Sequence, residues 1–254
     1  MAKASLLITV TVAMLSLGIG YFLGAKQEVI PTPSKKATLT PHSDQSLIKL
    51  LLRENLGERS FRFADVIEFS TGKQVLPYDS TKPPHQALQN IIHTSTQQAL
   101  TQLNQASSPT KGLSRINEAS RYVEDILLNL INQHPEFSCV IPKNLKGKEQ
   151  RAGYPDLMLT HLPSGTVAYL DPKLYAEASE NSSFRTFYYE PKTTTRKIQH
   201  DAIHFLLGIQ HDGKDGDWNF TGSKIVDISP LPLKLKAEFH SSNKEIYHKD
   251  LLAK

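Results

Sequence analysis

Cysteine is nearly absent from this chain of 254 residues, because Cys139 is the single one. One cysteine can form neither a disulfide within the chain nor a zinc cluster of several thiolates. The sequence also lacks a large excess of one charge, with a net charge of +4 and a pI of about 9.0. Hydrophobic residues make up 39% and charged residues 21% of it, which excludes a disordered chain, a coiled coil and a polytopic membrane protein. The mildly basic charge is compatible with a polyanionic partner.

Charge is also missing from residues 4–25, between Lys3 and Lys26. An apolar run of roughly 20 residues can span a bilayer, and it is longer than the apolar region of a cleavable signal. We therefore predict an N-terminal hydrophobic helix in residues 1–26, which is a transmembrane anchor or, alternatively, a signal segment. The protein would then be membrane-anchored by this single span or exported. Lysines on both sides leave the orientation open.

The remainder of the chain divides into a linker and one domain. Residues 27–45 contain three prolines among threonine, serine and lysine, a composition typical of an extended linker. We expect the domain to begin with a helical and hairpin part at residues 46–110, with the hairpin at residues 60–78. Its core would follow at residues 111–254.

Within this core, the apolar spacing predicts strands interspersed with helices. This order is typical of a mixed α/β layer domain. The predicted helices are residues 114–132 and 195–209, and the predicted strands are residues 137–141, 154–162, 166–170 and 224–228.

Two acidic residues are expected at the same edge of the sheet. Asp156 opens one predicted strand and Asp171 closes the next, and Pro163-Ser164-Gly165 is a good turn between the strands. Two neighbouring carboxylates repel each other unless a positive charge joins them, and a hard divalent cation takes oxygen ligands. If the strand continues through Pro172, Lys173 lies on the same face as Asp171.

Pro155-Asp156, fourteen further residues and then Asp171-Pro172-Lys173 resemble the PD-(D/E)XK signature of the restriction-endonuclease-like nuclease superfamily. The aspartates lie at the ends of apolar strands, with a long predicted helix on either side, as the family has them. The resemblance implies an α/β fold with a restriction-endonuclease-like αβββαβ core, in which helices flank a mixed central sheet. It also implies a type II restriction enzyme-like endonuclease that hydrolyses DNA phosphodiester bonds and leaves 5′-phosphate products.

The resemblance assigns roles to individual residues. Asp156 and Asp171 would bind Mg²⁺, or Mn²⁺ in its place, and Lys173 would be the catalytic lysine. Many members add a glutamate from the preceding helix. Glu124 is the preferred candidate because it borders the apolar stripe of that helix, and Glu118 is the alternative. DNA is the expected partner, together with the membrane through residues 4–25 and a second copy of the chain in a homodimer.

Basic residues on both sides of the acidic pair are candidates for phosphate contacts, which add affinity rather than sequence choice. These candidates are Lys148, Arg151, Arg185, Lys192, Arg196 and Lys197. Two other functions stay open at this point. One is a membrane-tethered nucleic-acid-binding module without catalysis. The other is a zinc metallohydrolase that uses His200 and His204, whose spacing is that of zinc-binding histidines on a helix.

Overall fold

The computed structural model describes residues 43–183 and 187–251. The chain divides into residues 1–47 and residues 48–254, and apart from residues 43–47 the description below concerns the second unit. The apolar residues 4–25 and nearly all of the linker lie outside the described residues, so membrane anchoring stays a prediction. Among the helices within the described ranges, none is both long and apolar enough to cross a membrane.

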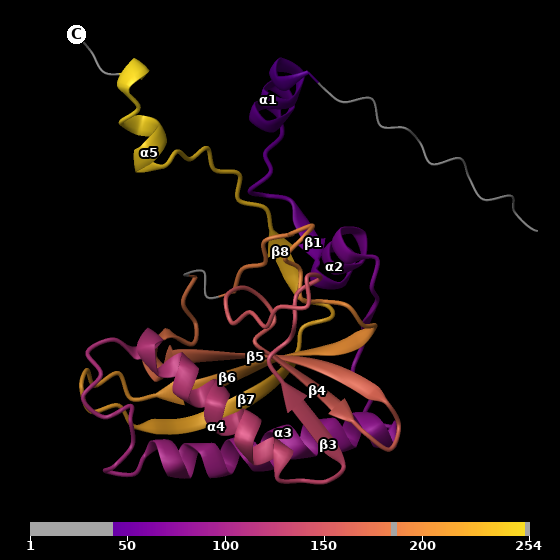
Figure 1. The fold of residues 1–254 in the computed structure, drawn as a ribbon, viewed down its shortest axis with the longest axis vertical. Helices are drawn as coiled ribbons and strands as arrows, with labels where there is room; N and C mark the ends of the chain where they lie inside the picture. Colours follow the sequence, from indigo (N-terminus) through magenta and orange to yellow (C-terminus); the bar gives the residue numbers. More distant parts are fainter. Residues whose placement is uncertain (1–42, 184–186, 252–254) are drawn as a thin grey trace, which may run out of the picture. The chain divides into compact units, whose positions relative to one another are not determined.

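A six-stranded mixed sheet forms the centre of the fold (Figure 1). Its strand order is β2-β6-β5-β4-β3, and β7 also pairs with β6. The β3–β4, β4–β5 and β6–β7 pairs are antiparallel, whereas β5–β6 and β2–β6 are parallel. The strands are β2 (Val75–Leu76), β3 (Phe137–Val140), β4 (Leu157–His161), β5 (Thr166–Ala176), β6 (Ala202–His211) and β7 (Phe220–Asp227). This confirms the mixed α/β prediction and the β4–β5 hairpin that carries the acidic pair.

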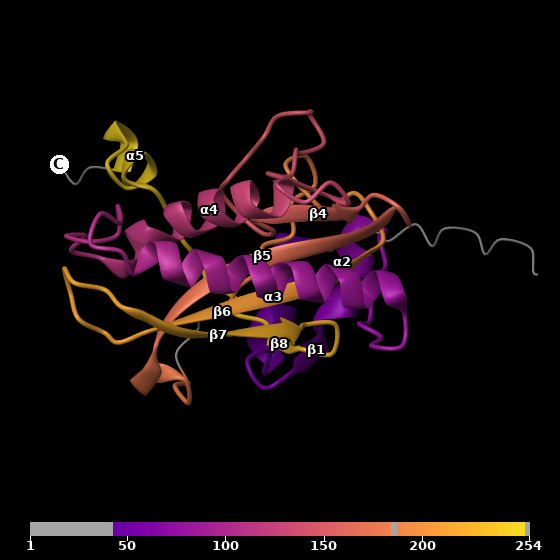
Figure 2. The same ribbon diagram turned by 90° about the horizontal axis from the view of Figure 1, so that it is seen from below.

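Two helices cover one face of this sheet, α3 (Pro83–Leu103) and α4 (Ser120–Asn132), and Figure 2 shows them side by side. A 3₁₀ turn at Ile116–Ala119 leads into α4. Buried α4 residues recur at the spacing of one helix face, which packs on α3 and the sheet. These residues are Val123, Leu127, Leu130 and Ile131. The predicted helix at 114–132 is therefore confirmed in its main part.

A second, smaller apolar cluster covers the opposite face. It contains Phe63 and Ile67 of α2 (Phe63–Thr71), together with Ile198 from the connection that leads into β6. The remaining regular elements are α1 (Asp44–Arg53), β1 (Ser60–Arg62) paired with β8 (Pro232–Lys234), α5 (Asn243–Ile246) and short 3₁₀ turns at Glu177–Ser179 and Lys249–Leu251.

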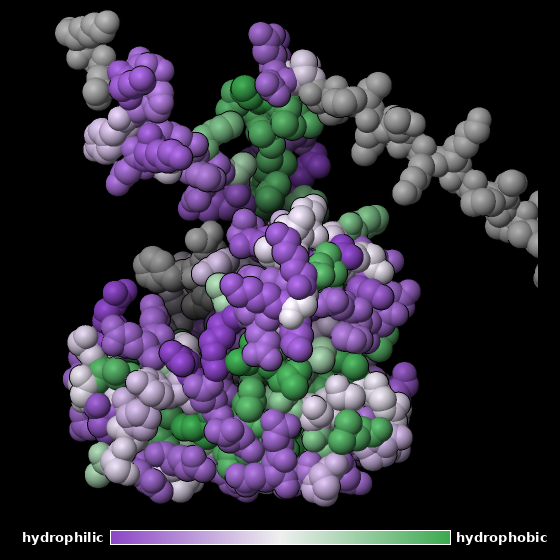
Figure 3. Space-filling model, in the orientation of Figure 1, coloured by the Kyte–Doolittle hydropathy of each residue, from purple (hydrophilic) through white to green (hydrophobic). Residues whose placement is uncertain are grey.

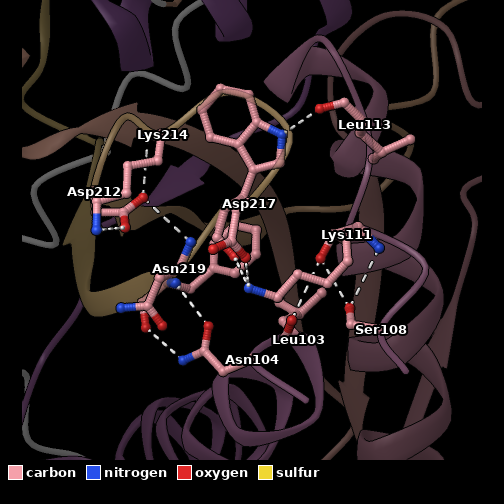
Figure 4. A network of polar contacts seen from close by, with 12 residues as sticks. Leu103, Asn104, Ser108, Lys111, Leu113, Asp212, Lys214, Asp217 and Asn219 are labelled. Carbon is pink, nitrogen blue, oxygen red and sulfur yellow. Dashed lines mark hydrogen bonds and ion pairs between the residues drawn. The ribbon is translucent and has the colours of Figure 1, made fainter. Parts of the chain in front are cut away.

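Apart from the two clusters, a polar network ties the β6–β7 connection to the segment that follows α3 (Figure 4). The Lys111 amine donates to Oδ1 of Asp217 at 2.7 Å and to the Trp218 carbonyl at 2.9 Å. The Trp218 indole N–H donates to the Leu113 carbonyl, and Asn104 exchanges two hydrogen bonds with the backbone of Phe220. These bonds pair polar groups of the buried residues Trp218 and Phe220 and hold the two segments together.

The predicted helix at 195–209 is wrong. Residues 195–201 have no helix, and β6 begins at Ala202. The described part of the connection from β5 to β6 contains only the 3₁₀ turn at Glu177–Ser179, so the second helix of the expected αβββαβ core is missing there. The mixed sheet with flanking helices is present, but the described part of the connection between the parallel strands β5 and β6 has no α-helix.

The predicted hairpin at residues 60–78 is also wrong. Phe63, Ile67 and Thr71 are buried at helical spacing in α2, and Gly72 ends this helix in the left-handed conformation, with φ of 70°. A C-terminal glycine of this kind is common because glycine adopts positive φ without strain. The strands on either side, β1 and β2, pair with β8 and β6 rather than with each other.

His204 is fully buried in the smaller cluster. Its Nδ1 lies 2.7 Å from the Tyr154 hydroxyl, and its ring packs against Phe63 and Tyr169. Burial lowers the pKa of His204 to about 3, below the value of about 6.5 expected in the unfolded chain. Protonation therefore favours the unfolded state. This contribution to stability is complete above pH 6.5 and is lost as the pH falls toward 3.

We expect the unfolding free energy to fall by up to about 1.4 kcal/mol per pH unit on this account. Urea titrations between pH 6.5 and 4.5 measure the slope. His204→Gln should flatten it, whereas the same change at the exposed His240 should leave it as in the wild type. Equal slopes for all three proteins would contradict the assignment.

Candidate active site

Asp171 and Lys173 lie two residues apart on β5, which continues without interruption through Pro172 to Ala176. Alternation along the strand therefore places both side chains on one face. Asp156 directly precedes β4, whose first residue, Leu157, pairs with Leu170. The hairpin register thus brings both aspartates to one end of the β4–β5 pair.

The ammonium group of Lys173 lies between the two carboxylates. Its Nζ is 2.5 Å from Oδ2 of Asp171 and 3.6 Å from Oδ2 of Asp156. The Asp171 side chain is 2% exposed, whereas that of Lys173 is 33% exposed. A buried carboxylate is thus paired with a cation that still reaches solvent.

The pKa values of Asp171 and Lys173 are both raised in this site. Burial, followed by the nearby charge of Asp156, raises the pKa of Asp171 to about 7, although Lys173 opposes the shift. Burial also opposes the charge on Lys173, but Asp171 and Asp156 outweigh it and raise the Lys173 pKa. Negative charge is therefore in excess here, and the site favours an additional cation.

Glu124 reaches the same open cavity from α4. The cavity is lined by Glu124, Asp156, Asp171, Lys173, Tyr154 and Tyr188, among others. Burial, and then the charge of Asp156, raises the pKa of Glu124, which Arg151 opposes. Glu118, the alternative candidate, is exposed in the 3₁₀ turn before α4 and does not line the cavity.

The chemistry of these donors fits a hard divalent cation, which takes carboxylate oxygens. Oδ2 of Asp171 is buried and lacks a directed hydrogen bond among the described residues, although the Lys173 amine is close to it. This oxygen therefore keeps lone pairs for a cation. Within residues 43–183 and 187–251, however, no three His, Cys, Asp or Glu side chains lie close enough together to enclose a metal. Lys173 provides the positive charge between the two aspartates.

The basic candidates differ in their surroundings. Lys148 is exposed in the connection between β3 and β4, and Lys192 is exposed next to Glu190. Arg196 is half-buried, and Arg185 lies outside the described residues. Lys197 is 3% exposed, and its amine donates to the Gln150 carbonyl at 3.0 Å, a position that does not present its charge to a ligand.

The histidine pair does not form the helical zinc motif. His204 is on strand β6 and His200 is in the loop before it, because the predicted helix is absent. The Nδ1 atoms of His200 and His204 face the hydroxyls of Tyr169 and Tyr154, at 3.2 and 2.7 Å. The structure thus removes the helical spacing on which the zinc hydrolase alternative was based.

Two residues near the acidic group have contacts that sequence reasoning did not identify. Arg151 pairs with Glu124 and Asp125 of α4, and Tyr154 lines the cavity while its hydroxyl contacts His204. Both contacts join segments at least 26 residues apart. No local spacing indicates such contacts.

Comparison with known proteins gives two findings. A model of the type II restriction enzyme MjaV family matches residues 56–250 of the chain. The type II restriction enzyme MjaV from Methanocaldococcus jannaschii is 30% identical to the chain over 216 residues, which cover 81% of the chain and 93% of the relative. The matched region includes every residue that lines the acidic cavity.

Proposed function

Because the chain belongs to the type II restriction enzyme MjaV family, we propose that it is an endonuclease that hydrolyses DNA with a divalent metal at this acidic site. The observation that carries the proposal is the buried Asp171 carboxylate, which shares the Lys173 ammonium with Asp156 in an open cavity. This arrangement offers oxygen ligands and a positive charge to a phosphate at one point of the surface.

Asp156 and Asp171 would hold Mg²⁺, or Mn²⁺ in its place. Glu124 lines the same cavity from α4 and would have to move toward the aspartates to add a third carboxylate. A bound divalent ion supplies Lewis acidity and lowers the pKa of a coordinated water. The Lys173 side chain is long enough to turn from the aspartates to a phosphate, where it would stabilise the charge that develops in the reaction. Exposed lysines such as Lys148 would contact the DNA backbone.

The test is to incubate the full chain with supercoiled and linear DNA in Mg²⁺, in Mn²⁺ and in EDTA. We expect cleavage with either metal and none in EDTA, and discrete fragments would reveal a recognition sequence. Glu124→Gln should slow cleavage by roughly 10- to 100-fold, because it removes one carboxylate from the cation site.

Glu118→Gln is the matched control, since it makes the same change at an exposed glutamate outside the cavity, and it should cleave like the wild type. Equal losses of cleavage rate in both variants would contradict the assignment of Glu124 to the cation site. Metal-independent binding without cleavage would instead favour the non-catalytic DNA-binding module.

A further inference from the structure

The connection between β3 and β4 is an ordered segment with exposed lysines. We call residues 141–156 the β3–β4 arm; Figure 2 shows it projecting beyond β4. The buried Asn144 side chain accepts from the backbone N–H groups of Lys146 and Lys148 at 2.9 and 3.2 Å, and it donates to Gln150. The arm therefore has internal hydrogen bonds of its own. Figure 3 shows mainly hydrophilic residues where the arm lies in Figure 1.

Two side chains from the β5–β6 connection fix the ends of the arm. The buried Lys197 amine donates to the carbonyls of Gln150 and Arg151, at 3.0 and 3.4 Å. The Gln199 amide donates to the Lys143 carbonyl at 2.7 Å. The backbone at Arg151 is thus held in place independently of the Arg151 side chain.

The Arg151 side chain turns toward α4. Its Nη1 lies 3.0 Å from Oε2 of Glu124, and its Nη2 pairs with Oδ1 of Asp125. The Glu124 side chain is only 13% exposed, so it has little solvent to stabilise its charge. A phosphate at this guanidinium would have to share it with two carboxylates, whose negative charges repel the phosphate. If the phosphate displaced them instead, it would leave a nearly buried glutamate without its partner.

We infer that Arg151 is a positioning residue, which orients Glu124 for cation binding at the acidic site rather than contacting DNA. The inference rests on the proposed function and deepens it. Groups that orient metal ligands without touching the metal have large effects on metal affinity, typically 10- to 100-fold. The lysines on the same arm, with Lys148 as the example, would serve DNA binding.

The experiment compares Arg151→Met with Lys148→Met in the full-length protein. Calorimetric titration with Mn²⁺ in the absence of DNA measures cation affinity, and anisotropy of a labelled duplex in EDTA measures DNA affinity. For Arg151→Met we expect Mn²⁺ binding to weaken by about 10- to 100-fold while DNA affinity stays within about twofold.

Lys148→Met should give the opposite pattern. Mn²⁺ affinity should be unchanged, whereas DNA affinity should fall and its salt dependence should decrease by about 0.9 in log–log slope, as for one lost phosphate contact. If Arg151→Met instead loses DNA affinity and keeps its Mn²⁺ affinity, Arg151 is a phosphate contact and the inference is overturned.

A double variant separates positioning from a general structural role. If Arg151 acts through Glu124, adding Arg151→Met to Glu124→Gln should weaken Mn²⁺ binding no further, because interacting residues are not additive. Additive losses would overturn the inference. If the wild-type protein neither binds Mn²⁺ nor cleaves DNA, the proposed function fails as well. If it does both and Arg151→Met matches it, only the inference fails.

Discussion

Replacement of Asp171 by asparagine should reduce the rate of DNA cleavage by at least about 10³-fold, which corresponds to about 4 kcal/mol of transition-state stabilisation. Asparagine keeps the size of the side chain and removes its negative charge. Because the Asp171 carboxylate is 2% exposed and faces both Lys173 and Asp156, few alternative ligands can reach its place. The measurement is the single-turnover cleavage rate in Mg²⁺, with DNA affinity measured on the same samples.

The matched control is Asp215→Asn, which makes the same change at an exposed aspartate in the β6–β7 connection. It should cleave like the wild type. Asp171→Asn should still unfold cooperatively and bind DNA, since it alters neither the apolar clusters nor the β3–β4 arm. A cleavage rate for Asp171→Asn within about tenfold of the wild type would contradict the catalytic role of Asp171.

The grouping of Asp156, Asp171 and Lys173 could be predicted because it depends on local features of the chain. A short turn joins two apolar strands, so the antiparallel register follows from the turn. Alternation along β5 then determines the face of Asp171 and Lys173. The prediction therefore uses no contact between residues distant in the sequence, and the structure contains both strands as an antiparallel pair.

The helix prediction for residues 195–209 is wrong because the apolar residues of β6 fit the helical period as well as the strand period. The run from Ala202 to Ile209 is apolar at almost every position, so residues at helical spacing, such as Ile198, Ala202, Phe205 and Ile209, are apolar too. The strand lies between β5 on one side and β7 and β2 on the other, and both of its faces are covered. Strands buried on both faces lose the alternation that identifies a strand.

The error at residues 60–78 has a different cause. Gly72 lies in the middle of the predicted hairpin, where a glycine is typical of a turn, but it is the residue that ends α2. The buried pair Phe63 and Ile67 would have favoured a helix, because they are four residues apart. The contacts of Arg151 with α4 could not be predicted at all, because they depend on the tertiary packing of the arm against that helix.

Lys173→Met should separate two consequences of the lysine charge. Without the ammonium group, the buried Asp171 and the neighbouring Asp156 repel each other with no cation between them. We expect the unfolding free energy in EDTA to fall by about 1–3 kcal/mol, below the full cost of breaking a buried pair because Lys173 is partly exposed. The cleavage rate in Mg²⁺ should fall by roughly 10²- to 10³-fold.

The control is Lys214→Met, which removes a lysine 3.7 Å from Asp212 in a surface pair where the lysine is 75% exposed. It should change stability by less than about 1 kcal/mol and leave cleavage unchanged. Unchanged stability in EDTA together with wild-type cleavage for Lys173→Met would contradict the assignment of Lys173 to the site.

Adding Mn²⁺ to Lys173→Met distinguishes two roles of the lysine, which are neutralisation of the aspartates and direct action on the phosphate. A divalent ion bound only by the folded protein should restore the stability of Lys173→Met, because it replaces the lost positive charge. If neutralisation were the whole role of Lys173, the same ion would also restore cleavage. A variant that regains stability with Mn²⁺ and stays slow would show that the ammonium group acts on the phosphate itself. We expect this second result, because Lys173 is 33% exposed in the open cavity, whereas its partner Asp171 is 2% exposed.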